Sequence, residues 1–339
     1  TALSVQPNYL DATVLLSTVY MRKGEYDKVP QLLETALKQK RNEHILWYMM
    51  GKAEEKLNNL EQAVYGYETA FGLRPDDEIT RIALENFLIQ KYDMKDPLRA
   101  KYADERFRAG RDFEGKNLLP KALHEYRRGL MLNPYSLDGR LLYAELFKRM
   151  GFRSKYLSIL SILEREGAKD VDLKDNIEIY TNLLEDEVSR KWKVDQFILP
   201  RTKFSFSLFY TDMTSSALHY GGDEASALLF QNMLLGYENL EVSQPKPAQG
   251  FSAMYRTARE SNSDYFIELT VNEMSRAFDI SVNLYHSGTG RLLKTFHTYR
   301  TGNNRLQDGL LSIAEQVSRS LPLRGTLLQK KFDTGLIDL

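Results

Sequence analysis

The chain has no cysteine among its 339 residues. This absence excludes disulfide bonds, thiolate metal ligands and a cysteine nucleophile, and it fits the periplasm or another part of the cell envelope as readily as the cytoplasm. Long apolar runs are also missing, since none approaches the ~20 residues that a membrane-spanning helix needs. The 46 basic residues balance the 46 acidic ones. Because no extended basic run occurs either, the sequence predicts no nucleic-acid-binding face.

Signatures of catalysis and of metal binding are scarce as well. The five histidines are scattered, and none forms the i, i+4 pair with a nearby glutamate that a helical zinc site shows. The segment from Gly288 to Gly290 lacks the Gly-Lys-Ser/Thr sequence of a phosphate loop, which favours a hairpin turn. Ser215 and Ser216 lack a Gly-x-Ser-x-Gly elbow. The sequence therefore predicts no catalytic residue, no cofactor and no metal ion.

A repeated phrase is present in the first half of the chain. Pro7, Pro75 and Pro134 each close a similar short stretch, and the first two lie two steps of about 34 residues apart, which is the period of a tetratricopeptide helix pair. A fixed period predicts helix pairs that stack side by side and form a binding surface, with no need for a catalytic pocket.

The clearest copy runs from His44 to Asp77. Trp47 and Tyr67 are large enough to fill the space between its two helices, whereas Gly51 falls where the helices come too close for a larger side chain. Pro75 ends the second helix, because it has no N–H and clashes with the preceding turn. In these residues the chain closely resembles the tetratricopeptide repeat family.

Three further copies are predicted at Leu10 to Glu43, Ala103 to Ser136 and Leu137 to Asp170, with Tyr126 buried between the helices of the second of these. The stretch from Glu78 to Tyr102 is too short for a full repeat, and we expect a worn-down repeat or an inserted helix there.

These patterns predict a multidomain chain. An all-α superhelix of tetratricopeptide-like repeats spans residues 1–172, with a degenerate insert at 78–102. A capping or linking helix follows at 173–199, and an α+β sandwich domain occupies 200–339. Residues at both ends read as parts of further elements, so we expect a fragment of a larger protein, with the α+β domain truncated at its C-terminal end.

The second domain is predicted to follow the order β-α-β-α-β-β-β-α-β, with one sheet and helices largely on one side. A hairpin is expected from Phe278 to Tyr299, reversing at Gly288-Thr289. Its inward face should carry Leu292 or Leu293 together with Phe296. A last strand is expected at 324–332.

Two short motifs of this domain, Ser263-Asp264-Tyr265 at a strand start and Ser287-Gly288-Thr289-Gly290 at the hairpin, resemble a known group of envelope domains. The group comprises the curli-secretion lipoprotein, the lipoprotein activators of penicillin-binding proteins and the amino-terminal domain of the Tol-system propeller protein. Ser287 departs from the commoner Asp or Ala. The resemblance implies a periplasmic, protein-binding module without enzymatic activity.

In the tetratricopeptide family, ligands bind the concave face, which the first helix of each pair lines. Val14 and Thr18 stand where chaperone-binding members have the first two residues of their carboxylate clamp, so we expect no such clamp. The mixed lining favours an extended or helical peptide, although extra helices could bury part of it. The predicted partner-binding residues are Thr18, Met21, Tyr48, Lys52, Glu55, Phe107, Arg111, Glu114, Leu141 and Glu145.

The sequence thus predicts a non-enzymatic interaction scaffold of the bacterial cell envelope that binds a protein or peptide partner. Two alternatives stay open. One is a cytoplasmic adaptor whose second domain mediates self-assembly into a homo-oligomer. The other is an enzyme or small-ligand sensor with its site in the α+β domain.

Overall fold

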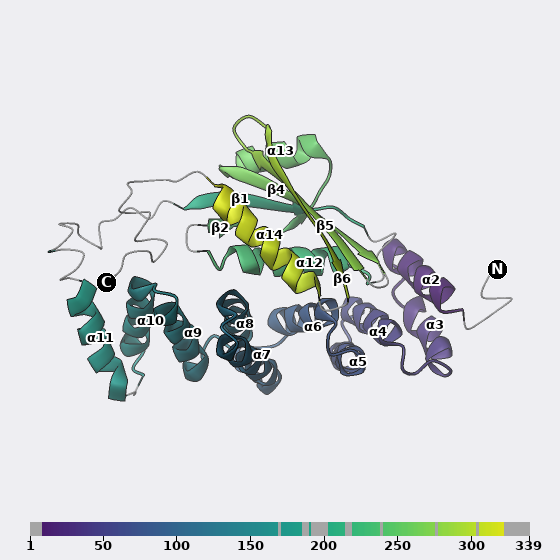
Figure 1. Cartoon of the computed structure of the whole chain (residues 1–339). Helices are drawn as coiled ribbons and strands as arrows, with labels where there is room; N and C mark the ends of the chain where they lie inside the picture. Colours follow the sequence, from purple (N-terminus) through teal and green to yellow (C-terminus); the bar gives the residue numbers. More distant parts are fainter. Residues whose placement is uncertain are drawn as a thin grey trace. The chain divides into compact units, whose positions relative to one another are not determined.

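The computed structural model describes residues 9–168, 171–184, 190, 203–213, 219–237, 240–274, 277–302 and 305–321 (Figure 1). The chain divides into two compact units. The first unit consists of the residues up to Lys91 together with Ser205–Met233 and Val242–Val317. The second unit contains Tyr92–Phe204 together with two short later segments. Helical repeats followed by a mixed α+β domain are the fold that the sequence predicts.

The first unit begins with helices that form the first two predicted pairs. These helices and the single helix after them are α2 (Leu10–Lys23), α3 (Lys28–Leu37), α4 (His44–Lys56), α5 (Leu60–Leu73) and α6 (Glu78–Lys91). Helix α6 occupies the stretch that is too short for a full repeat, which agrees with the prediction of one inserted helix.

The close approach of α4 and α5 occurs at Gly51, as predicted. Gly51 is buried, and a Cβ atom added there would lie 2.8 Å from the ring of Tyr67, which is itself fully buried. The prediction for Trp47 is wrong. Its ring is only half-buried, its Nε1 donates to the carbonyl of Arg41 at 2.8 Å, and it meets Tyr65 edge to face at the rim of the helix pair. An indole N–H needs an acceptor, and the backbone before α4 provides one.

The helices of the second unit form the two remaining pairs and a further helix. They are α7 (Pro97–Gly115), α8 (Leu119–Leu132), α9 (Leu137–Arg149), α10 (Arg153–Arg165) and α11 (Val171–Leu184). Helix α7 begins earlier than predicted, because the side chain of Asp96 caps it by accepting from the backbone N–H of Leu98. Helix α11 covers the first part of the predicted capping helix. The rest of that range lies, apart from Arg190, outside the described residues.

Aromatic rings and glycines on facing helices interlock in this unit. The fully buried ring of Tyr126 on α8 lies against Gly110 on α7, where an added Cβ atom would overlap it. Phe107 fills the corresponding place between Gly129 on α8 and Gly139 on α9. The burial of Tyr126 between helices is therefore confirmed.

The α+β domain contains one six-stranded sheet with the order β2-β1-β4-β5-β6 and with β3 beside β1. Strand β1 runs parallel to β4, and β4, β5 and β6 are antiparallel neighbours. The predicted order is confirmed, with β3 as an addition, whereas the predicted last strand at 324–332 lies outside the described residues. The elements are β1 (Phe204–Tyr210), α12 (Gly222–Leu234), β2 (Leu240–Val242), β3 (Lys246–Pro247), α13 (Phe251–Glu260), β4 (Tyr265–Met274), β5 (Ala277–His286), β6 (Leu292–Thr301) and α14 (Leu306–Ser320).

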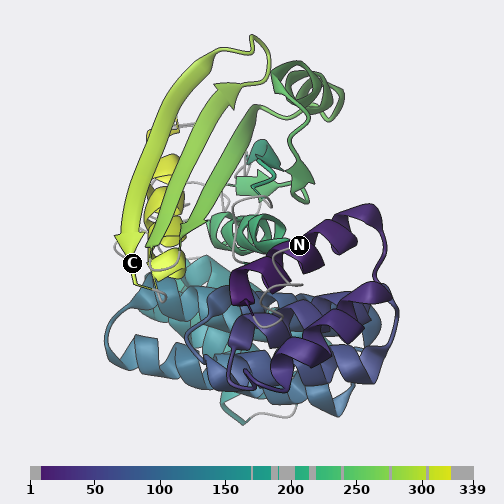
Figure 2. The ribbon, with the colours of Figure 1, turned by 90° about the vertical axis from the view of Figure 1, so that its right-hand side faces the viewer.

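Helix α13 covers part of the second face of this sheet, in addition to the predicted arrangement of helices largely on one side. Helix α14 runs along the strands (Figure 2) and brings Gly309 against Ile280 on one face. Helix α13 packs Met254 and Ala258 against Phe266 on the opposite face. On the face covered by α14, β4 and β5 carry buried apolar side chains, whereas on the α13 face Phe266 is followed by polar residues such as Thr270.

The hairpin of β5 and β6 is confirmed. Val282 pairs with Phe296, which is buried, and the chain reverses before Gly290, whose φ of 68° suits glycine. Leu292 and Leu293 are 47% and 46% exposed, so the prediction that one of them faces the helices is wrong. A register shift next to Leu284 separates these two residues from the inward face.

Candidate functional site

The binding residues predicted in the first unit lie mostly inside it. Thr18 and Met21 are buried, and Lys52 and Glu55 are partly buried and form an ion pair at 3.5 Å. Tyr48 is completely buried. This face of α4 is therefore occupied within the described unit.

The occupant of the face is a segment that precedes α12. The hydroxyl of Tyr48 donates to the carbonyl of Tyr220 at 2.7 Å. A Cβ atom added to the next residue, Gly221, would lie 3.7 Å from Cε of Lys52, which is an ordinary van der Waals contact. Tyr220 is 172 positions away from Tyr48 in the chain. The repeats thus hold a piece of their own polypeptide on the face where the sequence predicts a ligand.

The residues predicted in the second unit divide differently. Arg111 is exposed, as a surface contact requires, whereas Phe107 is 3% exposed and belongs to the core beside the glycines described above. Glu114 accepts from the hydroxyl of Tyr126 at 2.7 Å, and Glu145 accepts from that of Tyr156 at 2.8 Å. Leu141 packs half-buried against the cluster around Tyr156. Phe107 is therefore a packing residue, and its removal cannot probe binding alone.

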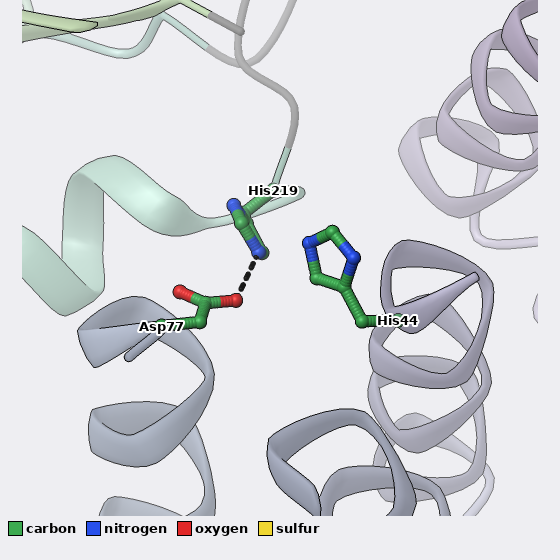
Figure 3. A group of neighbouring side chains, drawn as sticks. All are labelled: His44, Asp77 and His219. Carbon is green, nitrogen blue, oxygen red and sulfur yellow. Dashed lines mark hydrogen bonds and ion pairs between the residues drawn. The ribbon is translucent and has the colours of Figure 1, made fainter. Parts of the chain in front are cut away.

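A buried polar cluster of the first unit is centred on His219, which the sequence shows only as one of five scattered histidines. Its Nε2 lies 2.7 Å from Oδ2 of Asp77, and its Nδ1 lies 2.7 Å from Oε1 of Glu273 (Figure 3 shows the first contact). The backbone N–H of His219 also donates to Oε2 of Glu273 at 3.1 Å. The imidazole ring therefore joins the start of α6 to the end of β4.

Asp77 is held in place by the helix that it caps. Its Oδ1 accepts from the backbone N–H groups of Ile79 and Thr80, at 3.1 and 3.3 Å, and its Oδ2 accepts from the Thr80 hydroxyl at 2.6 Å. An aspartate at this position satisfies N–H groups that have no partner inside the helix. The capping role fixes the carboxylate that faces His219.

Charge explains the protonation of the cluster. Burial alone would lower the pKa of the His219 imidazole, but the negative charges of Asp77 and Glu273, with their hydrogen bonds, raise it to about 10. Burial would raise the pKa of the Asp77 carboxyl, but the charge and hydrogen bond of His219 hold that pKa well below its usual range. In the described structure, His219 is an imidazolium between two carboxylates at neutral pH.

A second histidine stands beside this group. The ring of His44 lies 6.1 Å from that of His219, centre to centre, and its Nε2 accepts from the guanidinium of Arg74 at 3.1 Å. Burial lowers the pKa of His44, and the positive charge of His219 lowers it further. His44 is consequently neutral.

Close packing encloses the cluster. The ring of Tyr48 meets His219 edge to face at 4.7 Å. A Cβ atom added to Gly222 would lie 3.2 Å from Cβ of His219 and 3.5 Å from Ile79, so a larger residue there would crowd the histidine. The carboxylates of Asp77 and Glu273 engage both ring nitrogens of His219. In the described structure the cluster therefore has a structural role, because it connects the start of α6 to the end of β4.

The motif Ser263-Asp264-Tyr265 also has a structural role. Oδ2 of Asp264 accepts from the backbone N–H of Ser205 at 2.9 Å, and the Asp264 carbonyl accepts from the N–H of Ser287 at 3.0 Å. Ser263 and Ser207 share a hydrogen bond between their hydroxyls at 2.7 Å. The motif ties the starts of β1 and β4 to the turn of the hairpin.

The fold defines a class of protein, namely tetratricopeptide-like helical repeats followed by a mixed α+β domain. Residues 203–319 match the second domain of the TPASS_0648 family. This match covers most of the α+β domain and leaves the resemblance to the curli-secretion group as a prediction. No curated protein matches the chain. No helix among the described residues is both long enough and apolar enough to span a bilayer.

Solved structures that resemble the chain include the PelC dodecamer from Paraburkholderia phytofirmans. It is 17% identical, with 37% of this chain and 91% of that chain covered and a TM-score of 0.26. PilF from Pseudomonas aeruginosa is 13% identical, with 55% of this chain and 92% of that chain covered and a TM-score of 0.24.

Proposed function

We propose that the chain is a non-enzymatic interaction scaffold of the bacterial cell envelope, which binds a peptide or protein partner through the first helices of its repeats. The observation that carries this proposal is the contact between α4 and the segment at Tyr220. The Tyr48 hydroxyl binds a main-chain carbonyl there. Every peptide offers such carbonyls, so this face has the chemistry of a peptide-binding surface.

In the second unit, the first helix of the next pair supplies exposed charges for a partner. Asp104 and Arg111 on α7 are both exposed and lie seven positions apart, which places them on one side of the helix. Arginine is enriched among residues that dominate binding energy. A partner peptide with charges of both signs would complement this side of α7.

Two observations support the remaining parts of the proposal. A non-catalytic role agrees with the engagement of both ring nitrogens of His219 by carboxylates. An envelope location agrees with the resemblance at Ser263-Asp264-Tyr265 and at the hairpin turn.

Site-specific photo-crosslinking in cells that carry the full-length protein tests the proposal. A photoreactive residue is placed at Asp104 or at Arg111, and the matched control position is Glu164, an exposed residue of α10, the second helix of its pair. We expect the same discrete protein adduct from both α7 positions and none from Glu164, with the partner identified by mass spectrometry.

Equal labelling at all three positions, or no adduct at either α7 position, would contradict binding at this face. An adduct with a second copy of the chain would instead favour the self-assembling adaptor. Fractionation of the same cells gives the compartment independently, and recovery in the cytoplasmic fraction would contradict the envelope location.

A further inference from the structure

We propose that His44, Asp77 and His219 form a binding site for one divalent transition-metal ion of the zinc type. One ligand atom from each of the three residues lies within 4.8 Å of the other two. The three come from α4, from the residue that caps α6 and from the segment before α12 (Figure 3). Two imidazoles and one carboxylate are a donor set that zinc accepts, with a fourth position left for another ligand.

The surroundings orient these donors as they do in known metal sites. Metal-ligating histidines commonly give their other ring N–H to a carboxylate, which fixes the ring and leaves one nitrogen for the ion. Nδ1 of His219 has such a carboxylate, Glu273, at 2.7 Å. Asp77 is held by Thr80 and by the first turn of α6. These hydrogen bonds therefore fix the orientation of the ligand atoms of His219 and Asp77.

The charges of the cluster also suit a cation. Asp77 and Glu273 are both buried, and in the described structure they share a single imidazolium charge. When the ion binds, Nε2 of His219 gives up the proton that it shares with Asp77, and that proton passes to solvent. A divalent ion then faces two carboxylates and two neutral imidazoles, so the buried charges balance.

Binding requires two small rearrangements. The separation of 2.7 Å between Nε2 of His219 and Oδ2 of Asp77 must open to about 3.3 Å, the spacing of two ligands in a tetrahedral zinc site. The Arg74 guanidinium must leave Nε2 of His44, and Asp76, already 3.8 Å away, offers it another partner. Until then, a proton and a guanidinium occupy the lone pairs that the ion would take.

The consequence of an ion at this place is structural. It would connect the first repeats to the segment before α12 in the α+β domain, in addition to the hydrogen bonds already present. This inference does not depend on the proposed partner or on its binding face.

Zinc titration of the full chain tests the proposal. The chain is prepared without a histidine tag, stripped with a chelator and titrated with zinc chloride by calorimetry, and bound zinc is counted by elemental analysis after gel filtration. Because the chain has no cysteine, thiolates cannot contribute. We expect one zinc per chain, and Co²⁺ in place of zinc should give the visible absorption of a tetrahedral site.

The variant His44→Phe removes the donor nitrogens and keeps an aromatic ring, and we expect zinc affinity to fall at least about tenfold. The matched control is His297→Phe, because His297 also pairs with a carboxylate, Asp279, at 2.5 Å, but on the exposed side of the hairpin. Binding by the control should equal that of the parent chain. Circular dichroism checks that both variants are folded, and His44→Ala replaces His44→Phe if the larger ring does not fit.

Failure of the parent chain to bind one equivalent of zinc would overturn the proposal. So would equal binding by the parent and by a folded His44 variant, which would show adventitious association. These outcomes would not contradict the proposed partner-binding face, since that face is tested separately by crosslinking at α7.

Discussion

Replacement of His219 by glutamine tests how firmly the buried imidazolium joins the first repeats to the α+β domain. In His219→Gln, Asp77 and Glu273 stay buried while the positive charge between them is lost. Removing one partner of a buried ion pair typically costs about 3–5 kcal/mol, because the remaining charge has no compensation.

The structure places the expected loss near the lower end of that range. Asp77 keeps its hydrogen bonds from Ile79 and Thr80, and Glu273 keeps the backbone N–H of residue 219. We therefore expect the free energy of unfolding of the first unit to fall by about 3 kcal/mol. Adding Glu273→Gln should return part of the loss, because it removes one of the two uncompensated charges.

Urea denaturation with a chelator present measures this loss without a contribution from metal ions. Tryptophan fluorescence, to which Trp47 on α4 and Trp192 both contribute, and circular dichroism follow unfolding of the chain. The matched control is His297→Gln, which breaks an exposed histidine–aspartate pair and should cost no more than about 1 kcal/mol. A loss below about 1 kcal/mol in His219→Gln would refute the reasoning, since such a value is typical of exposed pairs.

Two further substitutions test the packing of the repeats. Gly51→Ala places a Cβ atom 2.8 Å from the buried Tyr67 ring and should lower stability by about 1–3 kcal/mol. Gly72→Ala on the next helix meets nothing within 4 Å and should raise stability by up to about 1 kcal/mol; equal effects in urea denaturation would contradict the helix contact. Phe107→Ala should lower the free energy of unfolding by about 3–5 kcal/mol in the same measurement. A variant as stable as the parent chain would contradict the burial of Phe107.

The repeat architecture could be predicted because its determinants are local and recur. Gly51 and Tyr67 lie within one copy, and Pro75 ends that copy by a property of its own backbone. The hairpin was predictable for a similar reason, since alternation of apolar residues and a glycine-rich turn are features of a single short segment. Its bulge was not, and that bulge leaves Leu292 and Leu293 exposed.

The site depends on contacts between distant parts of the chain, and the sequence carried little signal for them. Tyr48 has the helix position of a ligand-binding residue, but a segment 172 positions further on covers it. His219 contacts Asp77, which lies 142 positions away in the chain. The sequence around either residue gives no indication of that contact. For Phe107 a signal did exist: Gly129 and Gly139 on the neighbouring helices leave the space that its ring fills.

The shared use of Asp77 links two structural events that would otherwise be independent. Its carboxylate serves the first turn of α6 and the imidazolium of His219 at once. If that turn frays, His219 loses an acceptor, and if the segment carrying His219 leaves, the cap keeps an uncompensated buried charge. Local opening should then involve both elements as one cooperative unit. Hydrogen exchange would show this as a common protection of the amides of Thr80 and His219, although one lies in a repeat helix and the other in the α+β domain.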